Sequence, residues 1–218
     1  MQQNNNTPKT AVIMPAYNSG ATIEASVRSI LNQTVSNLVL IVVDDGSTDG
    51  TATLADTYAE RENVLVLHQK NRGLSGARNT GIRHSEAPYL LFLDADDRLA
   101  PMAIERLMEN ALENDADIVE GSYFNFARNY RRNHIHKAGQ MPAMALWGGA
   151  CGKAIRRELF ENVGFPEGYW FEDSVMHQIL YSEAANCRGI SDMAFERRLN
   201  SESITHVSRG NVRSIDTV

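Results

Sequence analysis

The sequence of 218 residues predicts an α/β fold in which a mostly parallel central sheet is flanked by helices. Short apolar runs rich in β-branched residues alternate with segments whose apolar residues recur at helical spacing. The runs are continuous, as expected of strands that are buried on both faces of a parallel sheet. Polar residues directly follow four of these runs, which places them at the edge of the sheet where ligands bind in α/β folds.

The first half of the chain alternates cleanly between the two kinds of segment. We predict four strands, at residues 11–14, 38–43, 64–67 and 89–93. Helices are expected at residues 21–31, 51–60 and 74–84. A further helix should begin near Pro101, because proline is favoured in the first turn of a helix.

The second half of the chain is less regular. A strand is predicted at residues 118–119, a short helix at 156–162 and a longer helix at 172–185. Residues 1–10 are polar and are expected to form a disordered tail, and the stretch after Asn200 has no periodicity. Because the remainder shows neither an internal repeat nor a clear linker, residues 11–218 are predicted to form one domain.

The composition argues against several classes of protein. An apolar fraction of 43% suits a soluble globular domain, and a net charge of −6 argues against a nucleic-acid partner. No apolar run is long enough to span a bilayer, and the N-terminus lacks the core of a signal peptide. The two cysteines are expected to be reduced, in a cytoplasm. A basic cluster at residues 128–137 is either a solvated loop or a surface for an anionic acceptor or a membrane.

Three aspartates, Asp94, Asp96 and Asp97, follow the fourth predicted strand. Carboxylates this close together repel one another unless a cation or protonation relieves the charge. At a strand end they are natural ligands for Mg²⁺ or Mn²⁺, and such a metal can also bridge diphosphate oxygens. The alternative is a solvated turn that caps the next helix, a role that suits Asp97 well.

Asp44 opens the segment DDGSTDG, directly after the second predicted strand. Ser47, Thr48 or Asp49 can cap the following helix, so a plain turn accounts for most of the segment. Such a turn leaves Asp44 without a structural role. We therefore expect Asp44 to accept hydrogen bonds from a base or from ribose hydroxyls.

Four motifs, in this order and spacing, resemble one family. They are VIMPAYN at 12–18, VVDDGSTD at 42–49, NRGLSGARNTG at 71–81 and FLDADD at 92–97. Together they look like the family 2 glycosyltransferases of the GT-A fold, over residues 10–185. The resemblance implies a Rossmann-like nucleotide-diphospho-sugar transferase fold, in which residues 11–98 bind the sugar nucleotide and residues 99–218 form the acceptor side.

The resemblance implies roles for residues that follow the first three strands. Pro15, Tyr17 and Asp44 would hold the base of a nucleoside diphosphate sugar, usually uridine, with Tyr17 stacked on it. Asp45 and Asn71 would lie along the nucleotide.

It also implies roles around the fourth strand. Asp94 would contact the ribose or the metal side, and Asp96 would be the ligand of Mn²⁺ or Mg²⁺. Arg78 would contact the sugar nucleotide, unless it forms an ion pair on the helix surface. His206, in the segment SITH, would be a third metal ligand, unless it is a surface histidine in the tail.

The second half is similar to bacterial capsule and surface-polysaccharide transferases of this family, through CGKAIRRELF at 151–160, GFP at 164–166 and ED at 172–173. There the Glu-Asp pair supplies the general base, so the resemblance assigns that role to Asp173. An inverting transfer needs a carboxylate to remove the acceptor hydroxyl proton. Two acidic residues in the first turn of a helix can also be there only because the helix dipole stabilises negative charge at its N-terminus. Trp147 either stacks on the face of a sugar or packs in the core. Lys153 either contacts the acceptor or a phosphate, or lies on the surface.

One signature of the family is missing: the Gln-x-x-Arg-Trp motif of processive synthases. Its absence favours the addition of a single sugar. The resemblance implies a metal-dependent, inverting transfer of that sugar from a UDP-sugar to a hydroxyl of a glycan or lipid-linked acceptor in surface polysaccharide synthesis. The enzyme would be cytoplasmic, at the inner face of the membrane. The alternatives are a haloacid-dehalogenase-like phosphatase that uses Asp94 and Asp96, and a non-catalytic nucleotide-binding module.

Overall fold

The computed structural model describes residues 9–127, 130–169 and 172–199. Its first half follows the predicted alternation. The elements are β1 (Thr10–Ala16), α1 (Ile23–Leu31), β2 (Leu38–Asp44), α2 (Thr51–Asp56), β3 (Val64–His68), α3 (Gly73–Arg83) and β4 (Tyr89–Phe92). All residues of β1 and β4 are buried, which explains their unbroken apolar runs.

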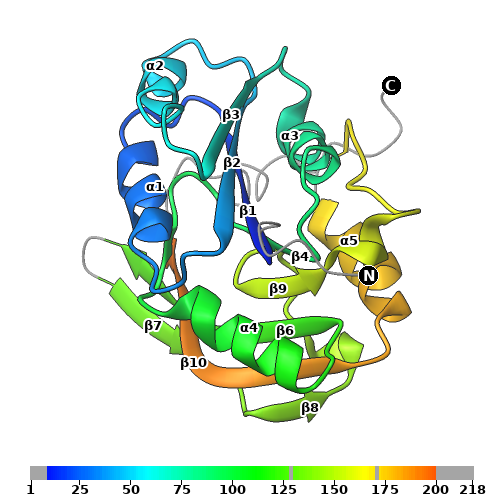
Figure 1. Ribbon diagram of the computed structural model, residues 1–218. Coiled ribbons are helices and arrows are strands. Elements are labelled where there is room, and N and C mark those ends of the chain that lie inside the picture. The colour runs from blue at the N-terminus through cyan, green and yellow to red at the C-terminus, as the bar shows by residue number, and fades with distance from the viewer. Residues whose placement is uncertain (1–8, 128–129, 170–171, 200–218) are drawn as a thin grey trace.

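These four strands form the parallel part of one sheet, in the order β3-β2-β1-β4 (Figure 1). Ala16 pairs with Asp44, and Asp44 pairs with His68, so β1, β2 and β3 end level with one another. Parallel strands present their carboxyl ends at the same edge of a sheet. The loops that follow these strands therefore meet there, as the sequence predicts.

The second half continues the same sheet with mixed directions. It contains β5 (Arg98–Leu99), α4 (Ala103–Glu113), β6 (Ile118–Ala127), β7 (Tyr130–His134), β8 (Gly139–Met141), β9 (Lys153–Arg156), α5 (Glu172–Ile179) and β10 (Cys187–Arg198). Strand β9 runs antiparallel between β4 and β6, whereas β10 runs parallel to β6. Strands β5 and β8 pair antiparallel with β10, and β7 pairs antiparallel with β6.

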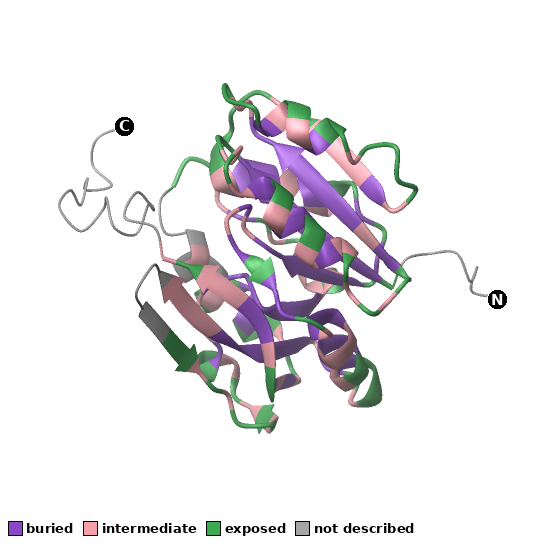
Figure 2. Cartoon of the chain, turned by 90° about the vertical axis from the view of Figure 1, so that its left-hand side faces the viewer, coloured by how far each residue is buried: buried purple, intermediate pink, exposed green. Residues whose placement is uncertain are grey.

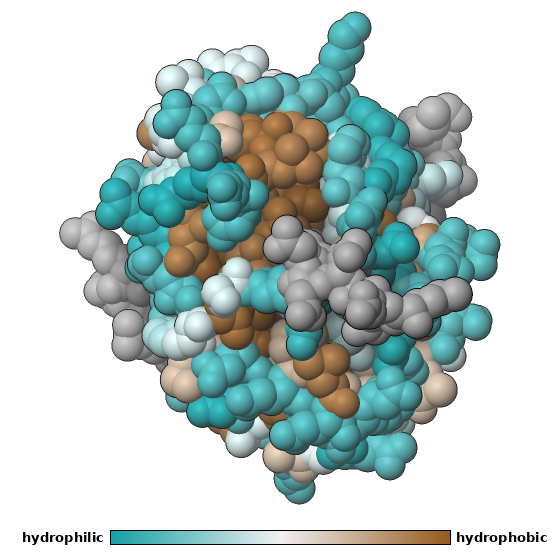
Figure 3. Space-filling model, in the orientation of Figure 1, coloured by the Kyte–Doolittle hydropathy of each residue, from teal (hydrophilic) through white to brown (hydrophobic). Residues whose placement is uncertain are grey.

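Strand side chains alternate between two cores. Val12 and Met14 pack on the face covered by α1 and α4, whereas Ala11 and Ile13 pack on the face covered by α3. A Cβ atom on Gly81 of α3 would lie 2.3 Å from Cγ2 of Ile13, so the helix lies directly on β1. Figure 2 shows the buried strands between helices with exposed outer surfaces. In Figure 3, apolar residues gather over β2 and β3, between α1 and α3.

Several predicted boundaries are wrong. The helices at 51–60 and 172–185 end early, at Asp56 and Ile179. The helix at 156–162 is instead the end of β9 followed by the 3₁₀ helix Arg157–Phe160. Thr10, which was expected in the disordered tail, belongs to β1. It is buried because β1 pairs with a strand on each side. The helix expected near Pro101 begins at Ala103.

Within the described ranges, no helix combines the length and apolar character needed to cross a membrane. Cys151 and Cys187 are both free and buried.

Candidate active site

Asp44 is buried at the end of β2. Its Oδ1 accepts a hydrogen bond from the backbone N–H of Ser47 at 3.2 Å, and its Oδ2 lies 3.1 Å from Nδ1 of His68. Nε2 of His68 lies 2.9 Å from Asp56. The contacts with Asp44 and then Asp56 raise the pKa of His68 above its ordinary value. Asp44 therefore does have a structural role, contrary to the sequence analysis, which also missed His68.

Asp45 joins the loop after β2 to the loop after β3. Its buried carboxylate accepts hydrogen bonds from the backbone N–H of Arg72 at 2.9 Å and from the side chain of Gln69 at 2.6 Å. Gly46 has φ +75, and a Cβ atom there would lie 3.0 Å from the backbone nitrogen of Asn71. The close approach of these two loops places the exposed Asn71 beside Asp45 at the sheet edge.

Tyr17 lies just beyond β1 and is 51% exposed, whereas Pro15 is a buried residue within the strand. The next residue, Asn18, accepts a hydrogen bond from the backbone N–H of Thr48 at 2.9 Å and donates its own N–H to Ser47 at 3.0 Å. The loops after β1 and β2 are thus bound together. Their arrangement leaves the ring of Tyr17 accessible at the same edge as Asp45.

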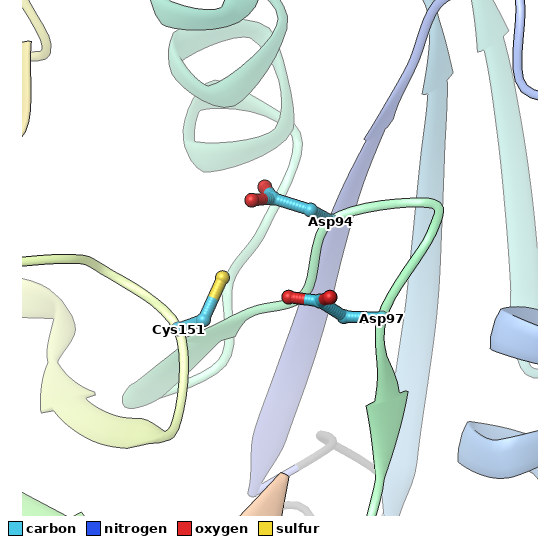
Figure 4. Close-up of side chains that lie close together, drawn as sticks. All are labelled: Asp94, Asp97 and Cys151. Carbon is cyan, nitrogen blue, oxygen red and sulfur yellow. The ribbon is translucent and has the colours of Figure 1, made fainter. Parts of the chain in front are cut away.

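The acidic cluster, which we define as Asp94, Asp96 and Asp97, follows β4. Candidate ligand atoms of Asp94, Asp97 and Cys151 lie within 4.8 Å of one another, and Figure 4 shows these side chains directed toward a common space. Asp97 is buried and accepts a hydrogen bond from the backbone N–H of Arg198 at 2.7 Å. That bond ties the acidic cluster to the end of β10.

The acidic cluster holds more negative charge than its surroundings neutralise. Burial, and then the charge of Asp94, raise the pKa of Asp96. Burial and the charges of Asp94 and Asp96 raise the pKa of Asp97 well above its ordinary value. Burial, followed by the charge of Asp94, also raises the pKa of the Cys151 thiol well above its ordinary value.

A hard divalent cation fits these carboxylates. The ligand atoms that converge belong to Asp94, Asp97 and Cys151, and Asp96, which is partly exposed, is not one of this group. A cation near Asp94 and Asp96 would relieve the repulsion that, after burial, raises the pKa of Asp96. Cys151 fits Mg²⁺ poorly, because sulfur is a soft ligand and this thiol keeps its proton. Asp96 as the metal ligand remains a prediction, and His206 lies outside the described residues.

Arg78 connects the acidic cluster to the candidate base. Its side chain is 2% exposed, and its guanidinium lies 5.0 Å from the ring centroid of Phe165. Nη2 donates to Asp94 at 3.1 Å, and Nη1 donates to Asp173 at 3.3 Å. The surface ion pair considered for Arg78 is therefore wrong, because α3 turns this face toward the interior. The structure brings Asp94 and Asp173, 79 positions apart in the chain, to the two sides of one guanidinium.

Lys153 is buried as well, so the surface alternative for this residue is also wrong. Its Nζ lies 2.8 Å from Oε1 of Glu120, which is buried with it. The backbone N–H of Trp147 donates to the same carboxylate at 3.0 Å. This pair joins β9 to β6, which gives Lys153 a structural role.

Comparisons with known proteins show which family the chain resembles. The family model for glycosyl transferase family 2 matches residues 11–171. Glycosyltransferase GlyG of Streptococcus pneumoniae serotype 4 is 32% identical over 216 residues, which cover 89% of this chain and 72% of GlyG. WfgD of Escherichia coli, a UDP-Glc:alpha-D-GlcNAc-diphosphoundecaprenol beta-1,3-glucosyltransferase, is 34% identical over 113 residues, 52% of this chain and 45% of WfgD.

The fold has solved counterparts. The crystal structure of S. aureus TarS 1-349 in complex with UDP-GlcNAc matches with a TM-score of 0.83 and 22% sequence identity. The match covers 94% of this chain but 62% of TarS 1-349, so the chain spans less than two thirds of that protein. The similarity confirms the predicted GT-A fold. The family model, which matches residues 11–171 and thus more than half of the chain, and the 32% identity to GlyG show that this protein belongs to glycosyltransferase family 2.

Proposed function

We propose that this protein is a metal-dependent, inverting glycosyltransferase that moves one sugar from a UDP-sugar to a hydroxyl of a glycan or lipid-linked acceptor in surface polysaccharide synthesis. The observation that carries the proposal is the bridge from Asp94 through Arg78 to Asp173. It joins Asp94, at the carboxyl end of β4, to Asp173, the carboxylate that would act as general base. The names of WfgD and of the TarS complex, which contain UDP-Glc and UDP-GlcNAc, support the choice of donor.

The donor would lie across the carboxyl ends of β1, β2 and β3. Tyr17 would stack on uracil, and Asp44 would accept from the base or the ribose. Asp45 and Asn71 would lie along the nucleotide, in loops that are already held together without it. Such preorganisation lowers the entropy lost on binding.

The acceptor hydroxyl would give its proton to Asp173 as its oxygen forms a bond to the anomeric carbon of the donor. The bond from that carbon to the diphosphate breaks, and its electron pair leaves with UDP. Attack opposite the leaving group inverts the configuration at that carbon. Arg78 would orient Asp173 for this step. A cation held by Asp96 and Asp94 would neutralise charge on the leaving diphosphate.

Calorimetric titration with UDP, with and without Mn²⁺, tests the donor site. We expect UDP to bind the wild type more tightly with Mn²⁺ and Asp96→Ala to lose that gain. Asp192→Ala is the matched control, because Asp192 is an exposed acid on β10. Equal UDP binding by Asp96→Ala and wild type, with Mn²⁺ present, would contradict the assignment of the metal.

Release of UDP from a UDP-sugar in the presence of acceptor separates an enzyme from a nucleotide-binding module. We expect Asp173→Asn to retain UDP binding and to lose turnover. Turnover at the wild-type rate would place the base elsewhere. Release of phosphate from simple phosphomonoesters, lost in Asp94→Asn, would instead favour the phosphatase.

A further inference from the structure

Strands β7, β6 and β10 lie side by side in the sheet (Figure 1). Their pairing puts two rows of side chains on one face of the sheet. In the first row, which we call the aromatic row, His134 pairs with Tyr123, and Tyr123 pairs with Phe195. The next row on the same face, the polar row, is Arg132, Asn125 and Arg197 in the same order of strands. The two rows share a face because they are two residues apart along each strand.

The aromatic row forms part of a pocket. The rings of Tyr123 and His134 stack with centroids 4.5 Å apart, and Trp147 stacks on Tyr123 at 5.0 Å. A hollow of about 280 Å³ is lined by these three residues together with Ile135, His136 and Ala145. Small-molecule sites span roughly 300–1,000 Å³. The hollow lies just below that range, so it has room for a single sugar ring, whose apolar C–H face would meet the aromatic side chains of the lining.

His134 is a neutral part of this wall. Burial, and then the charge of Arg132, lower the pKa of His134 below its ordinary value. Its Nε2 lies 3.0 Å from the side-chain nitrogen of Asn125. That contact turns the amide of Asn125 toward the pocket wall, and its Oδ1 is buried without a hydrogen bond from the described residues. A buried carbonyl oxygen in that state is a ready acceptor for a ligand hydroxyl.

The polar row carries two positive charges, at Arg132 and Arg197. Across the described ranges, neither Arg132 nor Arg197 has an acidic group within ion-pair distance. The two arginines lie on strands that flank β6, about 10 Å apart at the backbone. In a chain with a net charge of −6, two such guanidinium groups on one face favour a phosphate ligand.

The same face leads to the acidic cluster. The guanidinium of Arg197 lies 5.4 Å from the ring centroid of Trp147, in the pocket wall. Arg197 also lowers the pKa values of Asp96 and Asp97 by its charge, against the dominant effect of burial. The next residue, Arg198, donates its backbone N–H to Asp97. The pocket and the acidic cluster are thus neighbours that share Arg197.

We propose that this pocket is an acceptor subsite for a phosphorylated sugar, with the sugar ring in the hollow against Tyr123, His134 and Trp147 and the phosphate beyond it, against the polar row. The proposal rests on the proposed function, because an acceptor is needed only if the protein transfers sugars. A second hollow, of about 410 Å³ between β8 and the 3₁₀ helix Tyr181–Glu183, is lined by neither aromatic nor charged side chains and does not suit this ligand.

Calorimetry on the full chain, saturated with UDP and Mn²⁺ so that the donor site is filled, tests the proposal. The probes are glucose 1-phosphate, galactose 1-phosphate and N-acetylglucosamine 1-phosphate, each against its methyl glycoside. We expect at least one sugar phosphate to bind about 10-fold more tightly than its methyl glycoside, since hydrogen bonds to charged groups contribute about 1.5–3 kcal/mol. Arg132→Gln should remove that difference, and Asn125→Ala should weaken both ligands.

Arg61→Gln is the control, because Arg61 is an exposed arginine in the donor half. It should leave every affinity unchanged. UDP affinity, measured on the same variants before they are saturated with UDP, shows separately whether the donor site works. Intact UDP binding without any sugar phosphate binding would overturn the subsite alone. A loss of UDP affinity in Arg132→Gln, or unchanged sugar phosphate affinity in that variant, would also overturn it.

The sugar phosphate can be free or carried by a lipid. Ile135 and Met144, 62% and 68% exposed, lie in or beside the pocket lining and form an apolar rim. An octyl diester of the best sugar phosphate distinguishes the two sources. If the octyl diester binds more tightly than the free sugar phosphate, and Ile135→Ser removes that gain, the acceptor is lipid-linked. If both bind equally, the acceptor is a free sugar phosphate. Either result supports the subsite when it depends on Arg132.

Discussion

Replacing Arg78 with glutamine removes the guanidinium that lies between Asp94 and Asp173. Arg78 is 2% exposed, whereas the carboxylates are 37% and 40% exposed. Each ion pair therefore falls between an exposed pair, which contributes about 0–1 kcal/mol, and a buried one, whose disruption costs about 3–5 kcal/mol. Because water can solvate both remaining carboxylates, we expect a total loss of about 2 kcal/mol.

Urea unfolding in EDTA measures this loss, and thermal unfolding gives a second measure. For a chain of this length, a loss of about 2 kcal/mol corresponds to a fall in Tm of about 4–8 °C. Arg106→Gln is the control, because Arg106 and Glu109 form an exposed pair at 2.8 Å. We expect that control to lose less than about 0.5 kcal/mol. An Arg78→Gln variant no less stable than Arg106→Gln would refute the reasoning.

A double-mutant cycle tests the bridge itself. If Arg78 contacts Asp173 as described, the effects of Arg78→Gln and Asp173→Asn should fail to add by about 0.5–1 kcal/mol. Strict additivity would mean that the 3.3 Å contact carries no energy in solution.

Two further predictions concern packing and charge. Gly81→Ala should cost about 1–3 kcal/mol in urea unfolding, because its new methyl group overlaps β1, whereas Gly148→Ala, with open space around it, should be nearly neutral. In EDTA, Asp97→Asn should be more stable than wild type near pH 7. The folded state raises the pKa of Asp97 above 3.8, so wild-type stability falls as pH rises above that value. The difference should shrink toward pH 4, and a constant difference across that range would contradict the raised pKa of Asp97.

The parallel half of the fold could be predicted because its signals are local. Residues of β2 form one continuous apolar run, and the polar loop that follows marks its end. The same reasoning places Tyr17, Asp45 and Asn71 at one edge of the sheet, where the structure has them. The close packing of α3 was not visible in this way, although Gly81 and Ala77 permit it.

Strand β10 could not be predicted because its pattern changes register. It pairs with β6 through irregularities between Ile190 and Met193 and between Met193 and Phe195, so apolar residues do not alternate evenly along it. Its charged end, Glu196 to Arg198, also resembles a surface segment. The burial of Arg78 was equally hidden, because its partners Asp94 and Asp173 lie in separate parts of the chain.

The bond between Asp97 and the backbone of Arg198 has a consequence for synthesis. The two residues are 101 positions apart, so nearly half of the chain must emerge from the ribosome between them. Contacts of such separation form late, because loop closure costs entropy before the contact repays it. A nascent chain that already contains β1 to β4 therefore carries an unfinished acidic cluster. In the proposed mechanism, the acidic cluster would therefore reach its final form only after β10 docks.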